Sequence, residues 1–150
     1  RTAAEVCRRR KWRAIFATKF PQQLPRPLPD GVRQFDFVPF SQLLPHARAL
    51  VHHGGIGSCA QAFAAGIPQL IMPMAYDQLD NATRVQQLGA GDFLREKRFK
   101  PDRVDKALGD LFDSSDVARQ CKEFAESIAA APGLTPACKA LEKLTTSEGG

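Results

Sequence analysis

The sequence has no long hydrophobic run. No stretch approaches the roughly twenty consecutive apolar residues that a membrane-spanning helix needs, and the first residues lack the apolar core of a secretory signal. The sequence therefore predicts neither a membrane span nor export, and we expect a cytoplasmic protein.

Cysteine pairs at metal-binding spacing are also missing. The four cysteines are Cys7, Cys59, Cys121 and Cys138, and no two of them have the close spacing of zinc ligands. Cys59 and Cys121 lie in apolar, helix-like segments, which indicates free thiols in a reducing compartment. A chain of 150 residues, 43% of them hydrophobic, can bury roughly two-thirds of its unfolded surface. We therefore expect one domain over residues 1–150 that folds without a disulfide or a metal.

Charge of one sign is in excess, because the net charge is +5. Residues 8–13 (RRRKWR) concentrate it and could attract nucleic acid or a membrane surface. A solvated helix end is the other interpretation, since cations complement the dipole at a helix C-terminus. No aromatic stripe accompanies the charges, as a platform for single-stranded nucleic acid requires. We therefore expect no nucleic-acid partner.

The most informative segment is residues 51–58, VHHGGIGS. A short apolar run at residues 49–51 suits a buried strand, and good helix formers follow at residues 58–65. The glycines therefore lie at the N-terminus of a helix, where unpaired N–H groups and the helix dipole attract anions. This arrangement is suited to a diphosphate.

Individual residues of this turn have candidate roles. Gly54, Gly55 and Gly57 allow a diphosphate to approach the backbone. Ser58 could cap the helix or donate to a phosphate oxygen, and His53 could add a donor at the strand end. The alternative is a glycine turn that serves tight strand-to-helix packing alone.

A second polar pair follows the next strand. Residues 67–73 contain a short apolar strand and a proline stop, after which Asp77 and Gln78 open a helix over residues 79–88. Ligands of open α/β sheets lie beyond the carboxyl ends of the strands, so Asp77, Gln78 and His53 should share one crevice. A carboxylate and an amide together suit sugar hydroxyls.

Structural roles remain open for several of these side chains. Asp77 could simply cap its helix, and Asn81 could bond back to the loop. His52 and His46 could pack or bond locally, and Phe37 and Phe40 could belong to the core.

Alternation of strands and helices predicts an α/β fold, a Rossmann-like doubly wound parallel sheet. We expect strands at residues 13–18 (buried), 32–38, 49–51 and 91–94, and a short one between the turn and the proline stop of residues 66–73. We expect helices at residues 3–10, 41–46, 58–65, 79–88, 101–112, 115–130 and 135–144, the last three packed on the sheet, and a frayed tail at residues 147–150. Residues 20–31, rich in proline, should form a surface loop.

The segment HGGIGSCAQ at residues 53–61 resembles the donor-binding signature of the UDP-glycosyltransferases and their bacterial relatives, glycosyltransferase families 1 and 28, which have the two-domain GT-B fold. Pro68, Pro73, Asp77-Gln78 and Asn81-Ala82 match its later positions, and residues 37–39 and 44–46 resemble its opening. The likeness covers residues 13 to about 91, and the rest by general layout. It implies that the chain is the C-terminal, donor-binding half, of the bacterial or sterol type.

The resemblance also implies site roles. His53, Gly55, Gly57 and Ser58 would hold the diphosphate, and Asp77 and Gln78 the donor sugar. The nucleoside would meet Phe37, where plant members have a stacking tryptophan, and Val38. Gln61 takes the place of the ribose-binding glutamate, and Phe40 replaces a glutamine. A UDP-sugar is expected first, although the His-His-Gly-Gly segment is closer to bacterial and sterol-type members, or to the antibiotic glycosyltransferases, some of which use dTDP-sugars.

The implied activity is hexose transfer, with inversion, to an acceptor hydroxyl. The glycine turn and His53 would stabilise the leaving diphosphate without a metal or other cofactor. The general base would come from the missing N-terminal acceptor domain, since no residue here is a convincing candidate, so this chain would be inactive alone. The acceptor could be a lipid, a sterol or a natural product, and work at a membrane surface stays open.

Two other functions remain as alternatives. One is a non-catalytic module that binds a nucleotide or nucleotide sugar. The other is a stand-alone GlcNAc-transferase subunit that requires a membrane partner. The start at Arg1 and the likeness of residues 77–82 to single-chain members favour a piece excised from a larger enzyme.

Overall fold

Helices and short strands alternate along the chain, as the sequence predicts. The structure is a computed structural model that describes residues 1–131, 133 and 135–146. The strands are β1 Ala14–Ala17, β2 Val32–Phe35, β3 Leu50–His52, β4 Gln69–Ile71 and β5 Gly91–Phe93. The helices are α1 Thr2–Arg10, α2 Phe40–Leu43, α3 Ile56–Ala65, α4 Gln78–Gln87, α5 Pro101–Asp113, α6 Ser115–Ala130 and α7 Thr135–Thr146. The predicted tail at residues 147–150 lies outside the described residues.

The strands form two parallel sheets, β1-β2 and β3-β4-β5. The α/β class and the parallel pairing are confirmed, but the strands do not join into one continuous sheet. Two local expectations are wrong. β2 ends at Phe35 rather than at Val38, because its partner β1 ends at Ala17. β1 is not fully buried, because each strand of a two-stranded sheet has one strand neighbour, and Ile15 is 41% exposed.

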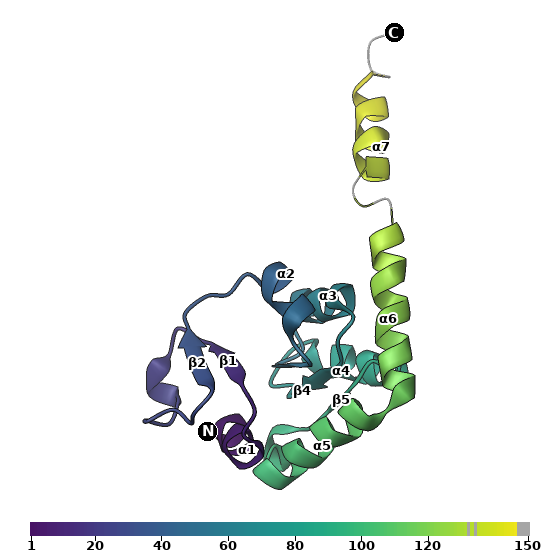
Figure 1. The fold of residues 1–150 in the computed structure, drawn as a ribbon. Coiled ribbons are helices and arrows are strands. Elements are labelled where there is room, and N and C mark those ends of the chain that lie inside the picture. The colour runs from purple at the N-terminus through teal and green to yellow at the C-terminus, as the bar shows by residue number, and fades with distance from the viewer. Residues whose placement is uncertain (132, 134, 147–150) are drawn as a thin grey trace.

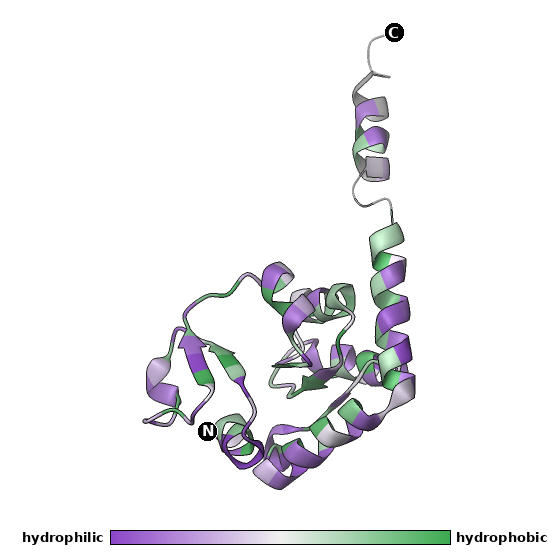
Figure 2. Cartoon of the chain, viewed as in Figure 1, coloured by the Kyte–Doolittle hydropathy of each residue, from purple (hydrophilic) through white to green (hydrophobic). Residues whose placement is uncertain are grey.

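β4 is the middle strand of the larger sheet, and helices cover both of its faces (Figure 1). Leu70 contacts a cluster from α1 and α5 that includes Val6, Val104 and Leu108. Ile71, the next residue, points to the opposite face and packs with Cys59 of α3 and residues of α4. Figure 2 shows the arrow of β4 mostly in the green of hydrophobic residues, as its sequence QLI leads one to expect. Because successive strand residues face opposite sides, one apolar strand anchors helices on both.

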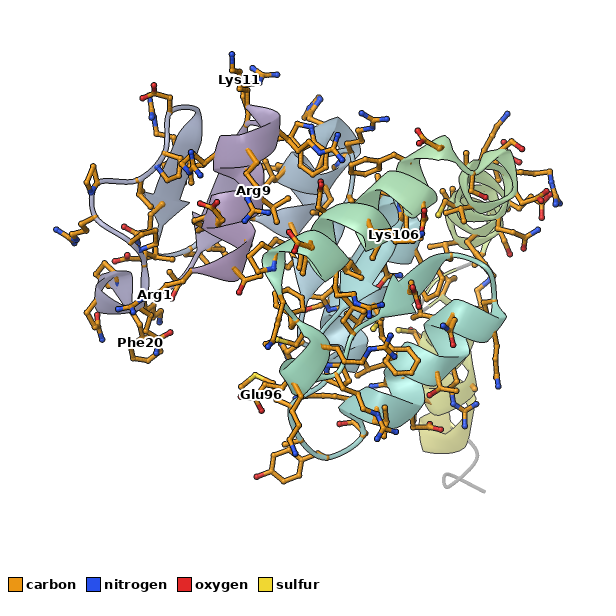
Figure 3. All side chains as sticks on the ribbon, turned by 90° about the horizontal axis from the view of Figure 1, so that it is seen from below. Arg1, Arg9, Lys11, Phe20, Glu96 and Lys106 are labelled. Carbon is orange, nitrogen blue, oxygen red and sulfur yellow. The ribbon has the colours of Figure 1, made fainter. Side chains whose placement is uncertain are left out.

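Ion pairs connect α1 and α5 at the surface, beside the apolar contacts between them. Arg9 Nη1 lies 2.6 Å from Asp102 Oδ1, and Arg10 makes two bonds to Asp105, of 2.6 and 2.9 Å. Figure 3 shows α1 beside α5, with Arg9 on the side of α1 toward that helix. Arg9 and Arg10, which belong to the basic cluster at residues 8–13, lie at the C-terminal end of α1 and are therefore paired with carboxylates of α5.

The C-terminal helices differ in how they pack. α6 lies against α3, where the rings of Phe63 and Phe124 meet edge to face with centroids 4.9 Å apart. α7 extends beyond the end of α6, away from the sheets (Figure 1). The expectation that all three C-terminal helices pack on the sheet is therefore wrong for α7, and α6 packs chiefly on α3 rather than on a strand. Among the described residues, no helix combines the length and apolar character needed to cross a membrane.

Candidate functional site

The turn from β3 to α3 contains the glycine segment. Gly55 is the N-cap residue, with φ −63° and ψ 139°, and the helix begins at Ile56. Ser58 is therefore the third residue of the helix rather than its cap, and its N–H donates to Gly55 O at 3.0 Å. The sequence placed the helix start two residues late because Gly57, a poor helix former, lies inside the first turn. The N–H groups of Ile56 and Gly57 have no carbonyl partner within the helix, as in every first turn.

The three glycines have different surroundings. Gly54 has φ +94°, and a β-carbon there would lie 2.8 Å from Ile71 Cγ2 and 3.0 Å from Gln78 O. A β-carbon on Gly55 would lie 2.7 Å from His53 Nε2, and one on Gly57 would meet nothing within 4 Å. Tight packing accordingly explains Gly54, whereas Gly57 leaves open space beside the helix start.

The two histidines face different environments. His53 is exposed, whereas His52 is half-buried and bonded within the protein. Their ring centroids are 6.3 Å apart and the rings lie at 80° to each other. Burial lowers the pKa of His52 to about 4, so its ring is neutral at pH 7. The local bonding that the sequence left open for His52 is confirmed.

Asn81 joins the glycine turn to the loop after β4. Its Nδ2 atom donates to Gly54 O at 3.0 Å and to Asp77 Oδ2 at 2.8 Å. The sequence-based alternative that Asn81 bonds back to the loop is confirmed. As predicted, the residues that follow two neighbouring parallel strands meet at the same edge of the sheet.

Asp77 and Gln78 begin α4. Asp77 occupies the N-cap position, but its side chain makes no capping bond, so the alternative of a simple cap is wrong. Gln78 Oε1 accepts from the N–H groups of Met74 and Ala75 at 2.9 and 3.2 Å. Gln78 therefore shapes the loop that carries Asp77, where the preceding Tyr76 adopts φ +56°.

Two of the residues predicted to meet a nucleoside, Phe37 and Val38, follow β2 of the smaller sheet, whereas the third, Gln61, lies on α3. Phe37 follows β2 and is 77% exposed, which excludes a core role for it, whereas Phe40 packs beside the buried Leu44. A shallow hollow of about 270 Å³ is lined by Ala17, Asp36, Phe37, Val38 and Phe40. Gln61 is exposed on α3, one turn after Gly57, so both lie on the same face of that helix.

The structure also reveals a role for a residue that the sequence analysis did not single out. Gln69 is fully buried on β4 and hydrogen-bonds to His52 and to the carbonyl group of Cys59. The signal in the sequence was a glutamine inside an apolar strand. Among the described residues, no group of three His, Cys, Asp or Glu side chains is arranged to hold a metal ion.

The parallel α/β fold, with the glycine turn and the Asp77 loop at one edge, defines the C-terminal half of a GT-B glycosyltransferase. The model of the erythromycin biosynthesis protein CIII-like C-terminal domain matches residues 15–144, and the chain belongs to that family. This confirms the resemblance found in the sequence.

Individual relatives of the chain are also named as sugar transferases. The chain is 36% identical to the aclacinomycin-T 2-deoxy-L-fucose transferase of Streptomyces galilaeus over 120 residues, 79% of this chain and 27% of that protein. It is 41% identical to the 3-alpha-mycarosylerythronolide B desosaminyl transferase of Saccharopolyspora erythraea over 101 residues, 66% of this chain and 24% of that protein. The chain therefore spans about a quarter of the length of these relatives.

A solved structure has the same fold. The crystal structure of the glycosyltransferase VinC in complex with dTDP superposes with a TM-score of 0.85 at 28% identity, covering 97% of this chain and 37% of that one.

Proposed function

We propose that this chain binds the nucleotide-sugar donor of a glycosyltransferase that moves a hexose, with inversion, to an acceptor hydroxyl. The observation that carries the proposal is the bridge made by Asn81, which holds the diphosphate-type turn and the Asp77 carboxylate together. An anion site and a sugar-binding carboxylate at one sheet edge suit the two ends of a nucleoside diphosphate sugar.

The diphosphate is assigned to the start of α3. The N–H groups of Ile56 and Gly57 and the positive end of the helix dipole attract its charge. Gly57 leaves space for the phosphate oxygens, and the Ser58 hydroxyl can donate to one of them. His53 supplies an exposed ring donor beside Gly55, at the end of β3.

The sugar and the nucleoside are assigned to the two sides of this turn. Asp77 accepts from sugar hydroxyls, and the amide group of Gln78 donates to them, its oxygen being engaged by the loop. Phe37, exposed beside Val38, offers its face to the base, and Gln61 can bond the ribose. We propose thymidine as the nucleoside because the similar VinC was solved with dTDP. Uridine, the first expectation from the sequence, is the competitor in the test.

The proposed role of the glycine turn in the transfer is to stabilise the negative charge of the leaving diphosphate. In the transfer, a bond forms between the acceptor oxygen and the anomeric carbon while the bond from that carbon to the diphosphate breaks. Negative charge grows on the leaving diphosphate, where the helix N–H groups and His53 stabilise it without a metal. The proton of the acceptor hydroxyl passes to a base outside this chain, so we propose that the chain alone binds the donor but does not transfer it. The two relatives' names support a natural product as the acceptor.

Calorimetric titration tests the assignment. The chain is titrated with dTDP, UDP and their glucose conjugates, alongside the variants His53→Ala and Asp77→Ala. We expect dTDP to bind, His53→Ala to weaken every ligand by about tenfold or more, and Asp77→Ala to weaken the sugar conjugates alone. His46→Ala, which removes another exposed histidine, is the matched control and should bind normally.

Other outcomes contradict the proposal. A folded chain that binds none of these ligands would overturn donor binding. Equal affinity for dTDP and dTDP-glucose, with no effect of Asp77→Ala, would favour a non-catalytic nucleotide-binding module. Transfer that appears when a membrane partner is added would favour the stand-alone subunit.

A further inference from the structure

A buried polar side chain lies behind the glycine turn. Gln69, on the middle strand β4, is 0% exposed. Its Nε2 atom donates to the carbonyl oxygen of Cys59 in α3 at 3.4 Å, and its Oε1 atom faces His52 Nε2 at 3.0 Å. A buried amide is costly unless bonded, so these contacts fix which way the Gln69 amide points.

His52 continues this series of hydrogen bonds to the turn. Its Nδ1 atom accepts from the N–H group of Gly54 at 3.1 Å. A ring nitrogen that accepts carries no proton, so the proton of the neutral ring is on Nε2, where it donates to Gln69 Oε1. The low pKa of His52, caused chiefly by burial, agrees with a neutral ring.

Both polar groups of the Gly54 backbone are therefore held. Its N–H group donates to His52, and its carbonyl group accepts from Asn81. Gly54 has φ +94°, a backbone conformation that residues with a side chain rarely adopt, and it lies just before the N-cap residue of α3. His52 from β3 bonds the peptide unit before the Gly54 α-carbon, and Asn81 from α4 bonds the peptide unit after it, so two elements hold Gly54 from both sides.

We propose that His52 and Gln69 are positioning residues for the diphosphate site, which orient the Gly54-Gly55 turn and reserve the Gly54 N–H for the protein. This inference rests on the proposed function. The two adjacent histidines then have different roles. His52 orients the turn from inside the fold, and the exposed ring of His53 contacts the ligand. The Gln69 amide acts one step further back, by selecting the His52 tautomer.

Nitrogen-15 NMR of the unliganded chain tests the series of hydrogen bonds from Gln69 through His52 to Gly54. We expect His52 to show an unprotonated Nδ1 and a protonated Nε2 from pH 8 down to about pH 5, below the ordinary histidine pKa of about 6.5. In Gln69→Leu, which keeps the apolar bulk but removes the amide, this tautomer preference should weaken and the Gly54 amide should exchange faster. A proton on Nδ1 in the native chain would overturn the proposal.

Binding of dTDP provides the second test. His52→Leu should weaken dTDP binding by about tenfold, because the turn must then be ordered when the ligand binds. His52→Asn should stay within about threefold of the native affinity, since its short side chain can present an oxygen near the position of Nδ1. Val51→Ala is the matched control, because Val51 is exposed and directly precedes His52 on the same strand. Native affinity in a folded His52→Leu chain would overturn the proposal.

The two tests separate this inference from the proposed function. If the native chain does not bind dTDP, the donor-site assignment fails. The His52 tautomer and the exchange rate of the Gly54 amide still decide whether the hydrogen bonds from Gln69 through His52 to Gly54 exist. If the native chain binds and His52→Asn is as weak as His52→Leu, the acceptor at Nδ1 has no role and the positioning proposal is overturned.

Discussion

The ring of His53 lies directly against Gly55, so that a β-carbon on Gly55 would be 2.7 Å from His53 Nε2. Gly55 has φ −63° and ψ 139°, which an alanine adopts without strain. Glycine is therefore required at this position for the placement of a neighbouring ring and not for the backbone conformation.

This contact predicts how Gly55→Ala behaves. The added methyl group should displace the exposed His53 ring, with a change of less than about 0.5 kcal/mol in the free energy of unfolding. The affinity for dTDP should fall as far as it does in His53→Ala. The double variant should then be no weaker than either single one, which a double-mutant cycle by calorimetry measures. Additive losses would show that Gly55 and His53 act separately.

Gly54 and Gly57 should respond in opposite ways to alanine. Gly54→Ala should cost about 2 kcal/mol or more, because the site combines positive φ with contacts at 2.8 and 3.0 Å. Gly57→Ala should raise the free energy of unfolding by about 0.5 kcal/mol, since alanine is the better helix former and meets no neighbour. Urea titration measures both.

Gly57→Ala should nevertheless weaken dTDP binding, because its methyl group occupies the space assigned to the phosphate oxygens. Gly109→Ala, another helix site where a β-carbon meets nothing within 4 Å, controls for helix propensity. It should gain stability and keep the native affinity. A Gly57→Ala chain that binds normally would place the diphosphate elsewhere.

The Asn81 bridge should also be measurable. Asn81→Ala leaves the Gly54 carbonyl and the Asp77 carboxylate without this donor, and we expect a loss of about 1–2 kcal/mol in urea titration. Thr83→Ala is the control on the same helix, because Thr83 Oγ1 bonds only back to Leu79 O within α4 in the described contacts. Equal effects of the two changes would mean that the bridge adds no stability.

The pKa of His52 predicts an acid-dependent loss of stability. The folded-state value is lowered to about 4 from 6.5, so between these pH values the unfolded chain binds a proton that the folded chain does not. Stability is therefore complete above about pH 6.5 and falls as the pH drops towards 4, by roughly 2–3 kcal/mol. Urea titrations at several pH values should show this slope and its reduction in His52→Asn. His46→Asn, which removes an exposed histidine, should retain the native slope.

Much of the fold was predictable because its signals are local. Apolar runs, helix formers and glycine or proline stops located every strand and every α-helix of the described residues to within a few residues, but not the 3-10 turns at Pro21–Gln23 and Glu96–Arg98. The strand ends were less accurate where they depend on a partner, as at Phe35, which pairs with the last residue of β1. The placement of α7 was wrong because an amphipathic helix does not specify which surface covers it.

The candidate site was predictable in its overall layout but not in its hydrogen bonds. The glycine turn and the Asp77 pair were identified from residue types, and the topology of parallel strands predicted that they would meet. The bond from Asn81 to Gly54 spans 27 residues, so spacing alone could not reveal it. Gln69 was missed because a single polar residue in a three-residue strand does not reveal whether it faces solvent or a buried partner.

The four free cysteines have a practical consequence. Cys7, Cys59 and Cys121 are buried, and burial raises the pKa of each thiol, that of Cys121 to about 11, whereas Cys138 on α7 is exposed. The thiolate is the reactive form, so a maleimide spin label added to the native chain should attach at Cys138 alone. The unmutated sequence thereby carries a single reporter on the helix that extends away from the sheets.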